Sequence, residues 1–84
     1  MNHAEISTQL TEVFAVILEL DPSDITAELS PDSCERWDSL RHIQLMAAID
    51  ETFAIELTFE QQLEAITFDL ACEVVAEALG TGTI

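Results

Sequence analysis

Apolar residues recur at helical spacing near the start of the chain. The apolar residues lie at i, i+4, i+7, i+8, i+11 and i+12, which places them on one face of a helix: Ile6, Leu10, Val13, Phe14, Ile17 and Leu18. Asn2 followed three residues later by Glu5 is typical of a capped helix start, and Asp21-Pro22 opposes continuation at the other end. The pattern predicts an amphipathic helix over residues 3–19.

A second helix is predicted from Ser39 to Phe53. Asp38 is a good N-cap residue, so Ser39 falls at the first helical position. One face is predicted to carry Leu40, Ile43, Met46, Ile49 and Phe53, with Leu45 and Ala48 beside it. The opposite face is polar, as expected for a helix that packs on one side only.

Two shorter helical segments follow an extended linker that holds Ile55 and Leu57. Thr58 with Gln61 forms a candidate capping box for a brief helix near residues 59–64. Thr67 can cap the next helix, and Gly80 is a plausible stop. The apolar positions of this last helix are Leu70, Val74, Val75, Ala78 and Leu79.

The connection over residues 20–37 is long and holds both prolines. Loops of this length are uncommon inside compact domains and tend to be functional. We expect Ile25, Leu29 and Trp37 to anchor it to the core. No segment alternates long enough to suggest a sheet, so the predicted fold is all-α: a small four-helix bundle with three longer helices, one short helix and a long first loop.

Length and charge limit the class of protein. A chain of 84 residues can bury one core, which predicts a single domain over residues 1–84 with an ordered part at about 3–79. Seventeen carboxylates against two arginines give a formal net charge of −15. This charge argues against nucleic acid and anionic membrane and favours basic protein surfaces as partners.

The remaining features of the composition indicate no metal site, signal sequence or membrane span. Cys34 and Cys72 allow one intramolecular disulfide, but their spacing suits no metal or redox motif and free thiols are expected. The Asp-rich stretches lack the ligand rhythm of an EF-hand, so no metal site is predicted. The first residues lack a basic signal region and no apolar run is long enough for a membrane span. We expect a cytoplasmic protein, without membrane insertion, that is a monomer.

Ser39 is the candidate for chemistry. A hydroxyl at a helix start lies near backbone N–H groups that have no partner in the helix, and the helix dipole favours an anion there. The same geometry that makes an ordinary helix start would therefore suit a phosphate ester.

The residues around Ser39 resemble the acyl carrier protein family. The resemblance rests on Asp38-Ser39-Leu40 at a helix start, followed by Leu45-Met46, Ile49, Asp50-Glu51, Phe53 and Ile55-Glu56-Leu57. It implies that a phosphopantetheinyl transferase attaches 4'-phosphopantetheine to Ser39, with Asp38 and Leu40 beside the attachment site. It further implies that the arm carries an acyl or aminoacyl group as a thioester to acyl-loading and acyl-transfer enzymes, without catalysis by the chain itself.

The family also implies two further sets of residues. Members often shelter an acyl chain between helices, for which the candidates are Met46, Ile49, Phe53, Ile66 and Val75; a packed core explains these residues equally well. Partners dock on the acidic second helix, which makes Asp50 and Glu51 candidates for recognition. An exposed acidic face that is merely solvated is the competing interpretation.

The two arginines depart from the family's usual pattern. Arg36 and Arg41 flank Ser39, with His42 alongside, so the strong positive charge of the chain gathers near the attachment position. Pairing of Arg41 and His42 with Asp38 is the favoured interpretation, because these residues are three and four positions apart on a helix. Contact of Arg41 with the phosphodiester or a partner is the alternative. Trp37-Asp38-Ser39-Leu40-Arg41-His42 looks more like freestanding carriers of specialised pathways than like a fatty-acid carrier.

An enzyme is not expected from this sequence. His3 and His42 give neither Cys34 nor Ser39 an oriented base in a cleft large enough for substrate. The serious alternative to a carrier is an unmodified acidic helical module that binds a basic partner. It would share the fold and the charge, and only modification of Ser39 separates the two.

Overall fold

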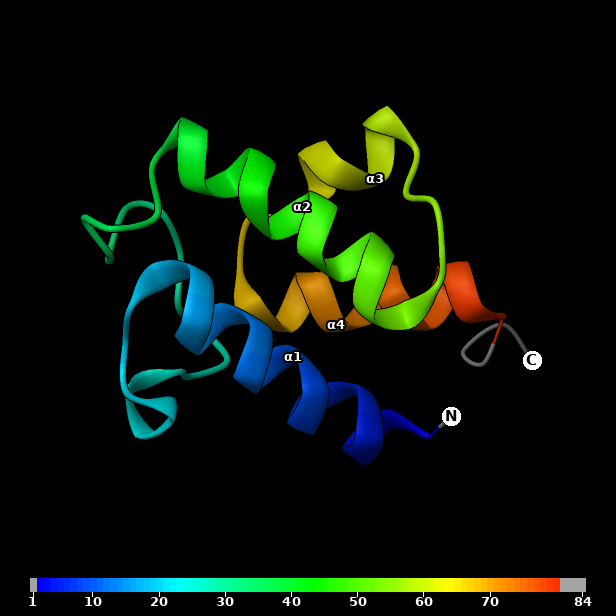
Figure 1. Cartoon of the computed structure of the whole chain (residues 1–84), viewed down its shortest axis with the longest axis horizontal. Coiled ribbons are helices and arrows are strands. Elements are labelled where there is room, and N and C mark those ends of the chain that lie inside the picture. Colours follow the sequence, from blue (N-terminus) through cyan, green and yellow to red (C-terminus); the bar gives the residue numbers. More distant parts are fainter. Residues whose placement is uncertain (1, 81–84) are drawn as a thin grey trace.

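The protein is an all-helical bundle in a computed structural model that describes residues 2–80 (Figure 1). Its elements are α1 (His3–Leu18), a short 3-10 turn η1 (Pro22–Asp24), α2 (Ser39–Phe53), α3 (Phe59–Glu64) and α4 (Phe68–Leu79). Within the described residues there is no strand. The predicted fold class is confirmed, with three longer helices, one short one and a long first connection. Residues 1 and 81–84 of the predicted 1–84 domain lie outside the described residues.

Side chains cap the start of every α-helix. In each case a side-chain oxygen accepts a hydrogen bond from the backbone amide three residues later, at Asn2, Asp38, Thr58 and Thr67. At Thr58 the bond is reciprocated by Gln61, which completes the predicted capping box. These bonds satisfy amides that have no partner inside the helix. They explain why the sequence defines the helix starts so well.

Three helices end in a left-handed residue. Gly80 has φ +76° and terminates α4 as predicted. α1 ends at Leu18, one residue before the predicted boundary, because Glu19 takes the left-handed conformation with φ 56°. Ala54 does the same after α2 with φ 54°. Non-glycine residues adopt this conformation at some cost.

The core lies between α1, α2 and α4, closed by the long connection. Helix α1 buries Ile6, Leu10, Phe14 and Leu18 completely, while Val13 and Ile17 are half-buried. The Phe14 ring packs edge-on against Trp37 and Phe68, with centroids 5.2 and 5.1 Å away. Such edge-to-face contacts favour a single core arrangement. They join α1, the connection and α4 at one point.

The predicted buried face of α2 is wrong in its first turns. Met46, Ile49 and Phe53 are buried as expected, but Leu40 and Ile43 are 64% and 66% exposed. The reason is the helical period: three residues cover less than one turn of 3.6, so successive steps of three drift away from the buried face. The buried face continues instead from Leu45 and Ile49 to the half-buried residues Arg41 and His42.

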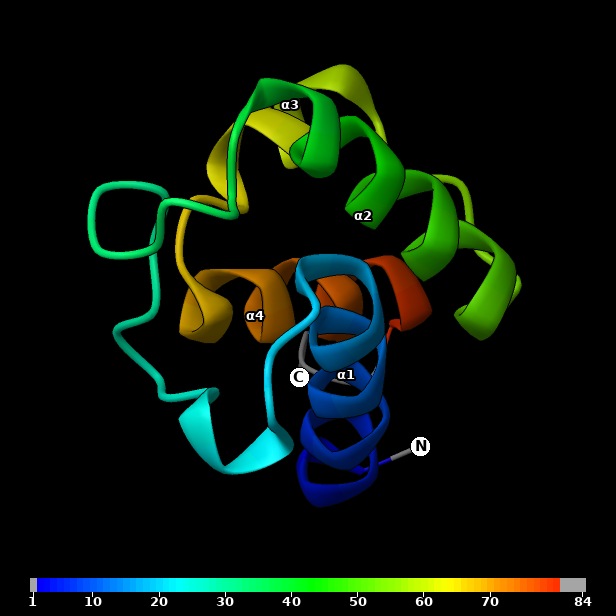
Figure 2. The same cartoon turned by 60° about the vertical axis from the view of Figure 1, so that its left-hand side comes forward.

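The long connection is anchored to the core as predicted. Trp37 is 1% exposed and Leu29 is 9% exposed, and Ile25 packs against the core while half-buried. Backbone amides of Phe68 and Asp69 donate to carbonyls of Leu29 and Ala27, at 3.0 and 3.1 Å. The connection therefore supplies partners for the first turn of α4 on its way from α1 to α2 (Figure 2).

Candidate functional site

Ser39 lies at the first position of α2 with an exposed side chain. The Asp38 carboxylate accepts from the Arg41 amide at 2.8 Å, and the Asp38 carbonyl accepts from the His42 amide at 2.9 Å. Among the described residues no hydrogen bond uses the amides of Ser39 or Leu40. The first turn of α2 thus offers a free hydroxyl beside two amides without a protein partner, which fits a phosphate ester on the serine.

An apolar groove of about 520 Å³ begins at Ser39 and runs between α2 and α3. Asp38 and Ser39 are part of its lining, and the rest of the lining consists of Pro31, Trp37, His42, Ile43, Leu63 and Ile66. A volume of this size is within the range of sites that hold small organic ligands. Any group attached to the Ser39 hydroxyl starts at the rim of this groove.

Trp37 and His42 form a hydrogen-bonded pair in the lining of the groove. The indole Nε1–H donates to His42 Nδ1 at 3.0 Å, and the two rings are stacked with centroids 6.0 Å apart. An indole nitrogen is a donor only, so His42 Nδ1 accepts and the proton is on Nε2. That nitrogen lies 2.9 Å from the Gln62 carbonyl at the end of α3 and donates to it. His42 therefore links the connection, α2 and α3.

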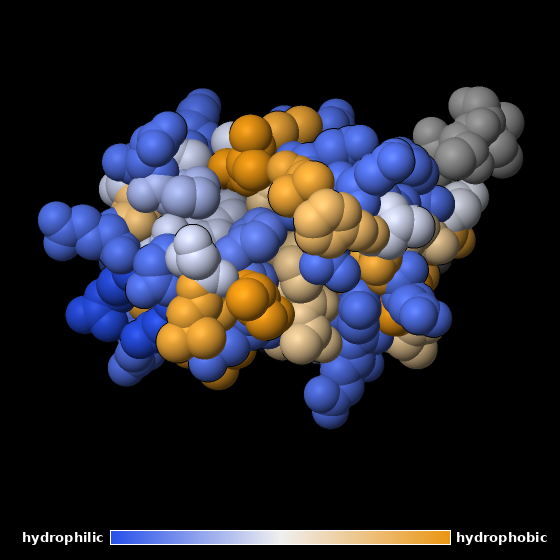
Figure 3. All heavy atoms as spheres, turned by 90° about the horizontal axis from the view of Figure 1, so that it is seen from above, coloured by the Kyte–Doolittle hydropathy of each residue, from blue (hydrophilic) through white to orange (hydrophobic). Residues whose placement is uncertain are grey.

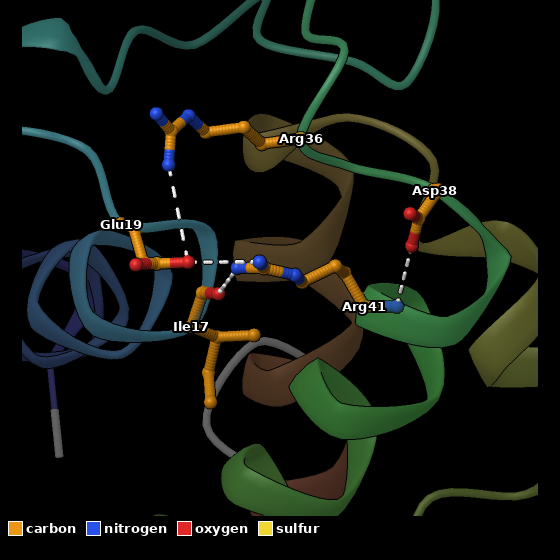
Figure 4. Close-up of polar contacts among 5 residues, drawn as sticks. All are labelled: Ile17, Glu19, Arg36, Asp38 and Arg41. Atoms are coloured by element: carbon orange, nitrogen blue, oxygen red, sulfur yellow. Dashed lines mark hydrogen bonds and ion pairs between the residues drawn. The ribbon is translucent and has the colours of Figure 1, made fainter.

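Arg41 bridges α2 to the end of α1 (Figure 4). One guanidinium nitrogen donates to the Ile17 carbonyl and the other lies 2.8 Å from the Glu19 carboxylate. Arg36 reaches the same carboxylate more loosely, at 3.9 Å. The hydrogen bond from Arg41 and the positive charges of Arg41 and Arg36 lower the pKa of Glu19 below its ordinary value.

The predicted side-chain pairing with Asp38 is therefore wrong. Both guanidinium groups point toward Glu19, while the Asp38 carboxylate accepts from the Arg41 amide (Figure 4). The physical reason is competition: Asp38 is used as the helix cap, and the carbonyls at the end of α1 attract a cation. His42 likewise contacts Trp37 and Gln62 instead of Asp38.

The two acidic residues singled out on α2 differ in their surroundings. Asp50 is half-buried, and its side chain accepts from the Leu57 amide at 3.0 Å, which holds the linker after α2. Glu51 is exposed. Among the described residues no ion pair involves either carboxylate, so Glu51 is the freer of the two to meet a partner.

The residues expected to line an acyl cleft fall into two groups. Met46, Ile49, Phe53 and Val75 belong to the buried core, with exposures between 0% and 6%. Ile66 is 53% exposed and lines the groove beside Ser39. The structure therefore brings only Ile66 next to the candidate attachment site.

An exposed apolar patch on α2 and in the region of α3 was not predicted from the sequence. This patch comprises Leu40, Ile43, Phe59, Leu63 and Ile66, each more than half exposed. From above, apolar side chains gather in the middle of the face, bordered by hydrophilic ones (Figure 3). Exposed apolar side chains gathered on one face of an acidic protein are typical of a contact site. The sequence signal for this patch was that Leu40 and Ile43 lie off the apolar helix face that ends at Phe53.

Both protein thiols are free and buried. Burial raises the pKa of Cys72 to about 11, and the negative charges of Asp69 and Glu73 add to the effect. A thiol with this pKa is protonated at neutral pH and is a poor nucleophile. Cys34 and Cys72 form no disulfide in the structure.

Within the described residues there is neither a metal-binding cluster nor a membrane-spanning helix. No group of three or more His, Cys, Asp or Glu side chains within residues 2–80 is arranged to hold a metal ion. Over the same residues, no helix has both the length and the apolar character needed to cross a membrane.

Comparison with known proteins places the chain in a family. No protein-family model matches it. An acyl carrier protein of Rubrobacter xylanophilus is 30% identical over 77 residues, which cover 92% of this chain and 95% of that protein. On this similarity, the chain belongs to the acyl carrier protein family.

Proposed function

We propose that this protein carries an acyl or aminoacyl group as a thioester on a 4'-phosphopantetheine arm attached to Ser39. The observation that carries the proposal is an exposed serine hydroxyl at the first position of α2, directly after the Asp38 cap, in a member of the acyl carrier protein family. The arm supplies the thiol that forms the thioester. The chain itself supplies attachment, orientation and recognition, and acts as a carrier without catalysis of its own.

Local chemistry supports attachment at this serine. A phosphodiester on the Ser39 hydroxyl would lie beside the amides of Ser39 and Leu40 and at the positive end of the α2 dipole. The groove that begins at Ser39 gives the attached group an apolar surface to rest on. The two arginines do not provide the charge, because their guanidinium groups contact Glu19.

The state of the protein thiols also supports the proposal. A carrier that presents a thioester must not pass its cargo to its own cysteines. Cys34 is 8% exposed and Cys72 is 2% exposed, and the raised pKa of Cys72 keeps that thiol protonated. The terminal thiol of the arm would then be the reactive thiol of the modified protein.

Charge and apolar surface together define the partners we propose. A net charge of −15 speeds encounter with basic docking surfaces, as expected for a phosphopantetheinyl transferase and for acyl-loading and acyl-transfer enzymes. Leu40 and Ile43 flank Ser39 on α2 with exposed side chains and would add apolar contact. Glu51 is the exposed carboxylate of the predicted docking pair. Arg41 is proposed to act within the fold, since its side chain is bound to α1.

The decisive experiment is intact mass measurement after incubation with coenzyme A, Mg²⁺ and a broad-specificity phosphopantetheinyl transferase. We expect the wild type to gain the mass of one phosphopantetheine group and Ser39→Ala to gain none. Ser33→Ala is the matched control, because Ser33 is also an exposed serine near α2 and lies in the connection. That variant should be modified like the wild type.

Two outcomes would contradict the proposal. Absence of any mass gain with several transferases would favour the unmodified acidic interaction module. Peptide mapping that locates the arm on a residue other than Ser39 would show that the attachment site is wrong.

A further inference from the structure

Trp37 separates the groove beside Ser39 from the interior of the bundle. It lines the groove, yet it is 1% exposed and belongs to the buried core. No other residue of the groove lining is part of that buried core. On its inner side the indole packs edge-on against Phe14, and on its outer side it stacks on His42.

The position of this ring is determined by several contacts at once. The indole N–H is bound to His42, and His42 is bound to the Gln62 carbonyl, so movement of the ring would break a chain of two hydrogen bonds. It would also open a void beside Phe14 in a close-packed core. An alkyl chain entering the bundle from the Ser39 groove would have to displace this ring.

An alternative place for the chain lies directly outside the ring. Ile43, Leu63 and Ile66 line the groove with exposed apolar side chains. Both ring nitrogens of His42 already have partners, so the imidazole adds a satisfied surface to the groove and leaves no buried polar atom that a cargo must match. Since Ser39 itself lines the groove, an arm attached to it can fold back along the groove and bring the acyl group at its far end against these side chains.

Building on the proposed function, we propose that Trp37, held by His42, closes the interior to the cargo, and that the carried group is a short or compact acyl chain held in the α2–α3 groove. The groove of about 520 Å³ must accept the arm as well as the acyl chain, which limits how much of the chain can be covered. Longer chains would extend past the groove into water. Met46, Ile49 and Val75 then act as ordinary core residues and do not contact the cargo.

Methyl NMR on the loaded protein tests this placement, because the two locations have separate reporters. The transferase is supplied with acetyl, hexanoyl and dodecanoyl coenzyme A, and each spectrum is compared with that of the bare arm. We expect shifts at Ile43, Leu63 and Ile66 that stop growing between the hexanoyl and dodecanoyl forms. Shifts or contacts at Met46, Ile49 and Val75 would overturn the proposal, and so would the absence of cargo-dependent shifts at both sets.

Substitution of Trp37 tests its role as the barrier. Trp37→Ala should move the dodecanoyl contacts to Met46, Ile49 and Val75, while Val16→Ala should leave them in the groove. Val16 is the control because it is exposed on α1 and lies in a different groove. If Trp37→Ala does not fold, Trp37→Phe removes the N–H bond to His42 and part of the ring. If the dodecanoyl chain contacts the core in neither of the Trp37 variants that fold, Trp37 is not the barrier.

A chemical route separates this proposal from the proposed function. Ser39→Cys labelled with alkyl methanethiosulfonates places chains of the same lengths at the rim without any transferase, and intact mass confirms a single label. If this labelled protein shows shifts in the groove while the wild type cannot be loaded enzymatically, the carrier function is refuted and the groove is supported as the place where an alkyl chain binds. Core shifts in it would refute the placement of the cargo whatever the loading result.

Discussion

The two ends of α2 are built on different principles. Its last turns bury Met46, Ile49 and Phe53 in the core, where apolar packing supplies the stability. Its first turns expose Leu40 and Ile43 and direct Arg41 and His42 inward, where polar contacts join α2 to α1 and α3. One end of the helix therefore carries the fold, and the other is free to present surface.

This difference follows from what each end must do. An apolar side chain withdrawn from water stabilises the fold but cannot meet a partner. The first turns of α2 are fixed by hydrogen bonds of Arg41 and His42, so Leu40 and Ile43 can remain exposed without loosening the helix. Ser39 is thus offered on a rigid element whose neighbouring apolar side chains are available for contact.

The largest effect on stability is expected at the buried end of α2. Phe53→Ala should lower the free energy of unfolding by about 3–5 kcal/mol, because the ring is 6% exposed and its removal leaves a cavity. Leu40→Ala is the control on the same helix and should change it by less than about 0.5 kcal/mol, since Leu40 is 64% exposed. Urea unfolding measures both. Similar costs for the two variants would remove the distinction between the ends.

Sequence patterns predicted the elements and most of the core because these depend on local signals. The caps at Asp38, Thr58 and Thr67 act within three residues, and the stripe of α1 follows the helical period. The face of α2 was predicted only in part. There Leu40 and Ile43 precede Met46 in steps of three residues. Because a helix has 3.6 residues per turn, these steps rotate away from the buried face and leave both side chains exposed.

The candidate site was predicted to the extent that its residues are adjacent in sequence. Ser39 after Asp38 is visible as a motif, and the groove residue Ile66 was among the candidates. The bridge from Arg41 to Glu19 spans 22 residues and the bond from His42 to Gln62 spans 20. Such contacts depend on how the helices are placed, which the pattern along a single helix does not determine.

A smaller effect is expected where α2 meets α1. Arg41→Met keeps the aliphatic stem but loses the bond to the Ile17 carbonyl and the ion pair with Glu19. We expect a loss of about 1–2 kcal/mol in urea unfolding. Arg36→Gln is the matched control and should stay within about 0.5 kcal/mol, because its 3.9 Å ion pair is largely exposed. A larger loss at Arg36 would reverse the assignment of the bridge.

The start of α2 itself should separate stability from function. Asp38→Ala removes the cap on the Arg41 amide and should cost about 1 kcal/mol. Ser39→Ala should change the free energy of unfolding by less than about 0.5 kcal/mol, because the Ser39 hydroxyl is exposed and has no hydrogen bond among the described residues. Thermal unfolding compares the two. Ser39→Ala losing as much as Asp38→Ala would mean that the serine has a structural role.

The smallest effect is expected in the pH dependence of the Glu19 contact. Hydrogen bonding by Arg41, with the charges of Arg41 and Arg36, lowers the pKa of Glu19 from its ordinary 4.5 in the folded state. A lowered folded pKa means that the stabilisation is complete above the unfolded value of 4.5 and is lost as the pH falls through the folded value. The stability difference between wild type and Glu19→Gln should therefore be constant near neutral pH and shrink in acid.

Removing Glu19 also relieves repulsion in a chain of net charge −15, so the comparison needs a background in which only the contact is absent. Repeating it in Arg41→Met supplies that background. There the acid-dependent part should shrink, leaving only the looser pairing with Arg36, which lies 3.9 Å from the carboxylate. An equal pH dependence in both backgrounds would show that Arg41 does not hold the Glu19 carboxylate, and that its bridge to α1 consists of the hydrogen bond to the Ile17 carbonyl alone.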